Sequence, residues 1–373
     1  MSERRPDNGA GAAATLESAF EQRDSWCAAA DRPLVGIFGN GMPENLIAAA
    51  GAVPVHLSMG NAVAEHEITS VIEPFVDDEV RTFLVRLMCG ELAAYRGIVF
   101  ARDDAPAMIA YQYATEWIRQ DRKRAATPSL FLWNLVHTDS APVRRFNSIQ
   151  AGKLFDFLEA TGLVRPDEAS LKSASVEEIR RSRALHAMAG AVSGSTAFRW
   201  RNAGRFMGAG EHADLLEAGL AQNSDSHPAG LRIGLVGSPL ASAPTYAMLE
   251  AFGQVVCDLQ PLGSVWPGPG NLAASLEDVL ARTAADSSCP RISPATAYRA
   301  AMVARLVEAR CELVVCQLAQ TDDTFGWEVP RLFDELKAQG IACVNLGFRD
   351  AAPPRAWVDE AASKIVKALE ACS

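Results

Sequence analysis

The chain has 373 residues, of which 49% are hydrophobic and 21% charged, which is typical of a soluble globular protein. This length suits two domains of ~100–200 residues each. The formal net charge of −10 argues against a general nucleic-acid-binding or anionic-membrane-binding surface. No apolar run approaches the ~18 residues of a membrane-spanning helix, and the polar N-terminus lacks a signal-peptide core, so we expect a cytoplasmic protein.

The first part of the chain alternates between strand and helix patterns. Short apolar runs predict strands at residues 33–38, 53–57, 97–100 and 129–134. Helical patterns lie between them at residues 43–50 and 106–120. Because Pro43 lacks an N–H group, it suits the first turn of a helix, where that group has no partner. Strands that alternate with helices predict a parallel, doubly wound sheet.

The remainder of the chain predicts a helical stretch and then a second α/β unit. Residues 148–222 have helical periodicity throughout. Further strands are predicted at 231–236, from 255, at 310–318 and at 341–346, with helices at 244–252, 330–340 and 357–370. We therefore expect two Rossmann-like (flavodoxin-like) parallel-sheet domains joined by a helical segment. The expected boundaries are a flexible tail and lead-in helix at 1–30, a first domain at 31–147, a helical bridge at 148–225 and a second domain at 226–373.

The cysteines and histidines are not spaced as metal ligands. None of the eight cysteines forms a C-x-x-C pair, and the odd spacing of Cys311 and Cys316 places them on opposite faces of a strand. The six histidines are scattered, with no H-x-x-x-H or H-E-x-x-H spacing. We expect Cys311 and Cys316 to be buried small apolar residues, and we predict no metal site from the cysteines and histidines.

Candidate chemistry lies in the turns that follow the predicted strands, because parallel α/β sheets bind ligands there. The turn Gly39-Asn40-Gly41 is half of a dinucleotide fingerprint, but Glu44 occupies the third glycine position, which disfavours NAD binding. There is no Walker A motif and no G-x-S-x-G elbow. The acidic pairs Asp103-Asp104 and Asp322-Asp323 are either solvated turns and helix caps or the polar lining of a site.

Several segments together carry a family resemblance. They are Met42-Pro43-Glu44-Asn45, Glu73-Pro74-Phe75-Val76, residues 97–117, Gly237-Ser238-Pro239-Leu240, Cys289-Pro290-Arg291 and residues 324–330. In order and spacing, the chain from about residue 33 to 350 resembles the 2-hydroxyacyl-CoA dehydratase and benzoyl-CoA reductase subunits, and the dehydratase D-component in particular.

The resemblance implies a cofactor that this chain lacks the residues to hold. Subunits of this family pair, and each usually binds one 4Fe–4S cluster through three cysteines and receives an electron from an ATP-driven activator. The resemblance places Gly39, Glu73 and Asp104 at those cysteine positions. Such clusters are held mainly by thiolates, whereas glycine offers no ligand and carboxylates are hard donors. We therefore expect no cofactor in this chain and a 4Fe–4S cluster in its partner.

The resemblance also implies an acyl-CoA thioester as substrate. We expect the chain to pair with a cluster-bearing paralogue, in a heterodimer or a larger assembly, or with a second copy of itself. Substrate would contact Asn40, Arg102 and Ser238, and Glu44 would be catalytic. Desolvation would raise the pKa values of Glu73 and Asp104 and make them proton donors. Two alternatives remain open: a structural or regulatory paralogue without activity, and a redox-independent acyl-CoA lyase or hydratase that uses the same two acids.

Overall fold

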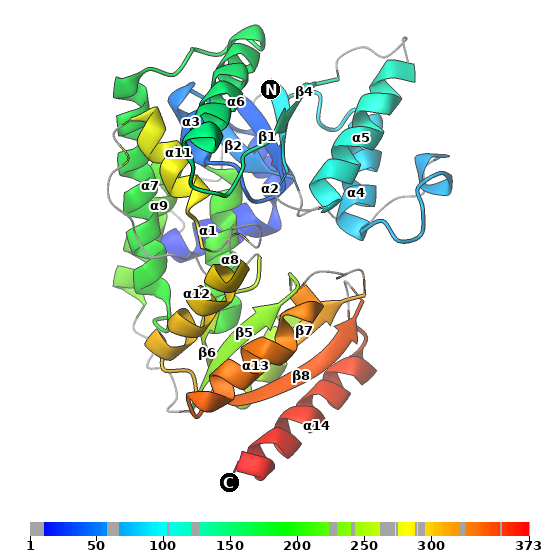
Figure 1. Ribbon diagram of the computed structural model, residues 1–373, viewed down its shortest axis with the longest axis vertical. Helices are drawn as coiled ribbons and strands as arrows, with labels where there is room; N and C mark the ends of the chain where they lie inside the picture. The colour runs from blue at the N-terminus through cyan, green and yellow to red at the C-terminus, as the bar shows by residue number, and fades with distance from the viewer. Residues whose placement is uncertain are drawn as a thin grey trace.

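The computed structural model of the protein describes residues 11–57, 67–102, 105–120, 127–223, 230–239, 243–261, 273, 275–287, 289, 295–320, 322, 325–350 and 353–372. Within these residues the chain forms two four-stranded sheets, and every strand pairing is parallel. Helices cover the sheets, as Figure 1 shows. The predicted fold class of two Rossmann-like α/β units is confirmed.

The first sheet has the strand order β2-β1-β3-β4. Its strands are β1 (Leu34–Phe38), β2 (Val53–His56), β3 (Gly97–Ala101) and β4 (Ser129–Trp133). The connecting segments contain α3 (Glu44–Ala49), η1 (Glu67–Ser70), α4 (Asp78–Met88) and α5 (Ala105–Gln120). The chain leaves β1 on one side toward β2 and returns on the other side to β3. The strand order therefore reverses between β1 and β3, which is where such sheets bind ligands.

The second sheet repeats this order as β6-β5-β7-β8. Its strands are β5 (Leu231–Gly237), β6 (Gly253–Asp258), β7 (Leu313–Ala319) and β8 (Ala342–Arg349). Its helices are α10 (Ala243–Glu250), α12 (Ala295–Glu308), η3 (Phe325–Trp327), α13 (Val329–Ala338) and α14 (Arg355–Cys372). In Figure 1 the arrowheads of β7 and β8 point toward the first unit. The carboxyl ends of this sheet therefore face the other half of the molecule.

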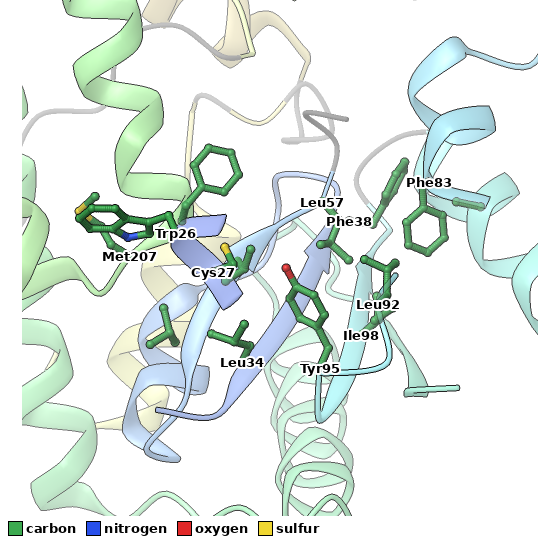
Figure 2. Close-up of a cluster of buried hydrophobic side chains, with 14 of the residues drawn as sticks. Trp26, Cys27, Leu34, Phe38, Leu57, Phe83, Leu92, Tyr95, Ile98 and Met207 are labelled. Atoms are coloured by element: carbon green, nitrogen blue, oxygen red, sulfur yellow. The ribbon is translucent and has the colours of Figure 1, made fainter. Parts of the chain in front are cut away.

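Both faces of the first sheet are buried. Leu34 and Phe38 contribute to one hydrophobic cluster, while Val35 and Ile37 between them contribute to the other, as the alternation of side chains along a strand requires. Figure 2 shows the first of these clusters, where Trp26 of α2 (Arg23–Ala28) lies beside Met207. Burial on both faces explains why the strands are continuous apolar runs rather than alternating patterns.

The helical stretch between the sheets consists of four α-helices and one short 3₁₀ turn in the described residues. They are α6 (Ala141–Ala160), α7 (Glu168–Met188), α8 (Gly194–Ala203), η2 (Gly204–Phe206) and α9 (Ala209–Gln222). The helix α11 (Leu276–Ala284) follows β6 in sequence but packs against α6, and its Val279 and Leu280 join the core of the first unit. The sequence analysis did not predict α11, and so it also missed the packing of this later segment against the first unit.

The N-terminal segment contains a helix that begins at Ala12. The helix α1 (Ala12–Glu21) packs against α8 and α9 and buries Leu16 and Ala19 completely. This helix lies within residues 1–30, where a flexible tail and a lead-in helix were predicted, and residues 1–10 lie outside the described residues. No helix in the described part of the chain is long and apolar enough to cross a membrane.

Gly237 provides a test of how closely β5 and β7 approach at the strand ends. Its φ is +116°, and a Cβ added there would lie 1.9 Å from the carbonyl oxygen of Gln317. We expect Gly237→Ala to lower the free energy of unfolding by at least about 2 kcal/mol, because it adds backbone strain and a collision with main chain. The control Gly152→Ala lies in α6 with open space around it and should be stabilising by up to ~1 kcal/mol. Urea unfolding measures the free energy of unfolding of both variants. Equal values for Gly237→Ala and Gly152→Ala would contradict the close approach of β5 and β7 at Gly237.

Candidate functional site

A buried ionic cluster joins the carboxyl end of the first sheet to the helical stretch. Glu44, the first residue of α3, accepts a hydrogen bond from Nε2 of His56 at 2.8 Å, and Arg181 of α7 donates to its other carboxylate oxygen at 2.7 Å. Burial by itself raises the pKa of Glu44, but the charge of Arg181 and the two hydrogen bonds outweigh it and lower the pKa overall. Glu44 is therefore ionised across the physiological pH range.

Arg205, in η2, extends this cluster toward the second unit. Its Nη1 donates to Nδ1 of His56 at 3.1 Å, and its Nη2 donates to the carbonyl oxygen of Pro261 at 3.4 Å. An arginine can only donate, so Nδ1 of His56 is the acceptor and the ring proton is on Nε2, facing Glu44. Burial and the charge of Arg205 lower the pKa of His56, which keeps the imidazole neutral.

The hydrogen bonds of Arg205 all go to uncharged acceptors. Besides His56 and Pro261, the guanidinium donates to the side-chain oxygens of Asn202 at 2.8 Å and Asn40 at 3.5 Å. Among the described residues no carboxylate lies within ion-pair distance of it. Burial lowers the pKa of Arg205 to about 10, so it remains a cation at neutral pH. The cluster thus contains two arginines and one carboxylate, and its excess positive charge is at the strand ends.

The carboxyl end of the second sheet holds a polar network around Gln317 of β7. Ser238 donates through Oγ to Asp322 at 2.5 Å and accepts from the backbone N–H of Ala319 at 2.8 Å. The Gln317 side chain donates to the carbonyl oxygen of Ser238 and accepts from Nε of Arg349. Ser238 directly follows β5 and Gln317 lies in β7, so the network is at the point where the strand order reverses.

Arg349 is a second buried arginine held by neutral groups. It is 3% exposed, and its guanidinium donates to Gln317, to the carbonyl oxygen of Pro239 and, at 2.9 Å, to that of Asp350. Burial lowers its pKa to about 10. Each sheet therefore has, at its carboxyl end, a desolvated arginine without a carboxylate partner among the described residues.

The residues predicted from sequence are divided among separate networks. Asn40 and Glu44 are brought together through Arg205 and His56. Arg102 is exposed and donates to the side chain of Asn134 at 3.4 Å. Ser238 belongs to the network of the second sheet. Asp104 lies outside the described residues.

Glu73 lies apart from these networks on an exposed turn. The Tyr113 hydroxyl donates to its carboxylate, and Arg81 donates to its backbone carbonyl oxygen. The hydrogen bond from Tyr113 lowers the pKa of Glu73. Glu73 is exposed to solvent, so the desolvation that was expected to raise its pKa does not occur.

The second acidic pair contains Asp322. Its carboxylate accepts a hydrogen bond from the backbone N–H of Phe325 at 2.8 Å, which is the helix-capping role considered for it.

The residues present do not fit a 4Fe–4S cluster of the kind that the family resemblance implies. Gly39, at one former cysteine position, has a φ of +95°, a conformation that a cysteine would adopt only with strain. The described residues contain no group of three histidine, cysteine or acidic side chains placed to hold a metal ion. Cys289 comes from a different segment and lies 3.5 Å from Nε2 of His137. A cluster needs several thiolates at one place.

Sequence reasoning missed most of the residues that build these networks. His56 and Arg349 each end a strand, and that position alone could have indicated them. Arg181 and Arg205 lie within a helical stretch where an arginine is ordinarily a solvated surface residue, so no local signal distinguished them.

Two parallel α/β units with polar clusters at their strand ends define a protein of the doubly wound α/β class, in which ligands generally bind at such strand ends. A family model described as 2-hydroxyglutaryl-CoA dehydratase, D-component, matches residues 40–356. Because this match covers most of the chain, the protein belongs to the 2-hydroxyglutaryl-CoA dehydratase D-component family, and the resemblance noted from the motifs is confirmed. No curated protein shows significant similarity to the chain.

The buried position of Glu44 predicts a pH-dependent contribution to stability. A carboxyl group whose pKa is lowered in the folded state stabilises the fold above its unfolded pKa, ~4.3, and this stabilisation is lost as the pH falls. We expect Glu44→Gln to lower the free energy of unfolding at pH 7 by about 3 kcal/mol, because Arg181 loses its partner. The loss should shrink as the pH falls below ~4.

Denaturant unfolding between pH 7 and pH 3 measures this dependence. Glu116→Gln is the control, because Glu116 also pairs with an arginine, Arg119, but on an exposed helix surface where solvent screens the charges. A stability difference between wild type and Glu44→Gln that is the same at pH 7 and pH 3 would contradict the ionic role of Glu44.

Proposed function

We propose that this chain is the cluster-free subunit of a 2-hydroxyacyl-CoA dehydratase or benzoyl-CoA reductase type of complex. It binds the acyl-CoA thioester between the carboxyl ends of its two sheets, and a paralogous subunit carries the 4Fe–4S cluster. Membership in a family described as a component of a CoA-dependent dehydratase supports a role within an assembly. The poor fit of Gly39 and Glu73 to a cluster supports the division of labour between the two subunits.

The observation that carries the proposal is Arg205. A desolvated guanidinium is costly unless an anion compensates it, and among the described residues this partly buried one is held only by neutral acceptors at the end of the first sheet. Its contact with Pro261 places it against the second unit. Coenzyme A carries several phosphate groups, and arginine is the side chain best suited to bind phosphate oxygens. Arg205 therefore suits the anionic part of an acyl-CoA.

The second sheet supplies the other side of the binding surface. Ser238 and Gln317 flank the reversal of strand order, and Arg349 behind them adds positive charge. The hydroxyl of Ser238 and the amide of Gln317 are neutral hydrogen-bonding groups of the kind that position a thioester or a pantetheine amide. In this proposal Arg205 attracts the anion and the second sheet orients the neutral part of the ligand.

The protonation states favour a binding role over acid–base catalysis by this chain alone. Glu44 is held ionised by Arg181 and His56, so it orients His56 rather than donating a proton. The pKa of Glu73 is also lowered, so its carboxyl group is a poor proton donor at neutral pH. Both observations weigh against a redox-independent lyase or hydratase that depends on Glu73.

Exposed aromatic residues support the pairing with another subunit. Trp327 of η3 is 83% exposed, and Phe75 and Phe348 are more than half exposed. Tryptophan and phenylalanine are enriched in protein–protein interfaces and are otherwise seldom so accessible. A partner that covers these side chains would remove apolar surface from water.

Iron analysis tests the division of labour directly. We expect anaerobically purified chain to contain less than one iron atom per polypeptide and to lack the broad visible absorption of a 4Fe–4S cluster, because the thiolates are missing. The complex co-purified from the native host should contain iron in the partner subunit. About four iron atoms bound by this chain alone would contradict the proposal.

Substitution of Arg205 tests the binding site. We expect Arg205→Gln to weaken binding of a 2-hydroxyacyl-CoA to the assembled complex by about 10–100-fold, the effect of losing a charge-assisted hydrogen bond of ~1.5–3 kcal/mol. The control Arg180→Gln removes an exposed arginine of α7 that pairs with Asp214 and Glu217. Isothermal titration measures affinity, and thermal unfolding establishes that both variants fold. Unchanged affinity in Arg205→Gln would exclude this site.

A further inference from the structure

A second cavity lies away from the strand carboxyl ends, between α7, the edge strand β6 and the last turn of α12. Its volume is about 160 Å³, whereas a single water molecule needs only ~10–15 Å³. Leu185 and Val256 form its apolar wall, and its polar side chains are His186, Arg232, Arg305 and Glu308. Figure 1 shows α12 beside β6, on the side of the second sheet next to the helical stretch.

Arg305 has unused hydrogen-bonding capacity in this cavity. Its Nη1 donates to Glu308 at 2.5 Å and its Nη2 donates to Nε2 of His186 at 3.3 Å. Its Nε is buried and has no hydrogen-bond partner. Because an arginine only donates, His186 accepts through Nε2 and is neutral, and burial together with the charge of Arg305 lowers the pKa of His186. A buried N–H group without an acceptor is rare in folded proteins, and it shows that the protein groups around Arg305 do not satisfy its guanidinium.

Arg232, at the start of β5, adds a second positive charge. Its Nε and Nη2 both donate to the carbonyl oxygen of Ala309, at 3.1 and 2.9 Å. Among the described residues its guanidinium has no carboxylate within ion-pair distance. Glu308 is the single carboxylate that lines the cavity, and its side chain is 66% exposed. The cavity therefore has two guanidinium groups and one solvent-exposed carboxylate, with a neutral histidine between them.

We propose that this cavity binds a tetrahedral oxyanion, either inorganic phosphate or the phosphate group of a small phosphomonoester. The remaining N–H groups on the terminal nitrogens of Arg305 and Arg232 donate to the oxyanion. Guanidinium groups bind phosphate oxygens with good geometry, and the apolar wall of Leu185 and Val256 strengthens these bonds by excluding water. This site is distinct from that at Arg205, because it is lined by the start of β5 and the end of α12 rather than by the carboxyl ends of the strands.

Glu308 makes the proposal testable with a gain of affinity. Its carboxylate occupies Nη1 of Arg305 and repels an incoming anion. Glu308→Gln removes this charge from an exposed position, so folding should be preserved, and we expect the dissociation constant for inorganic phosphate to fall by about 3–10-fold. Arg305→Gln and Arg232→Gln should each raise it by about tenfold or more.

The measurement is isothermal titration of the full chain with inorganic phosphate in a phosphate-free buffer, repeated with glycerol 3-phosphate. Tighter binding of glycerol 3-phosphate supports a phosphomonoester as the ligand, and equal or weaker binding supports free phosphate. Arg180→Gln, which removes an exposed arginine paired with Asp214 and Glu217, is the control that should leave phosphate affinity unchanged. The proposal is overturned if neither probe binds saturably to wild type, or if Glu308→Gln binds phosphate no better than wild type.

Discussion

The ion pair between Glu44 and Arg181 is the constraint on which the arrangement of the candidate site depends. It is the contact that fixes the start of α3 against α7, and through His56 it also fixes the end of β2. A buried carboxylate of this kind is tolerated only when its partners satisfy it, so the three side chains hold one another in place. Arg205 is oriented as a consequence, because His56 presents its Nδ1 acceptor only when Nε2 faces Glu44.

The arginines of the candidate site differ in whether a carboxylate compensates their charge. Arg181 is neutralised by Glu44, and its role is structural. Arg205 and Arg349 face neutral acceptors, and the cost of burying them is not recovered within the described residues. The same imbalance recurs in the cavity around Arg305, where two guanidinium groups line the cavity and one exposed carboxylate, Glu308, pairs with Arg305 alone among the described residues. An acidic protein, with a net charge of −10, thus places uncompensated positive charge at partly or fully buried positions, where solvent screens it little.

Much of the fold could be predicted from local sequence because both sheets are buried on both faces. The run at β1 is continuously apolar, β7 is apolar except for Gln317, and the turns that follow both strand patterns contain glycines and prolines. The helix α11 was missed because its packing on α6 depends on a partner more than a hundred residues earlier in the chain. The site was predicted only in part. Asn40 and Glu44 lie in one cluster, but the arginines that complete it come from helices distant in sequence.

The sequence by itself determined the family, the alternation of strands and helices, and the absence of thiols at Gly39 and Glu73, because all three are properties of residue identity and spacing. Only the tertiary structure decided which side chains act together. The pKa of Glu44 is lowered, rather than raised by burial, because Arg181 and His56 reach it from other elements. Arg205 stands out because no carboxylate of the described residues lies within ion-pair distance of it. Such properties depend on distances between residues far apart in the chain, which no local pattern of residues encodes.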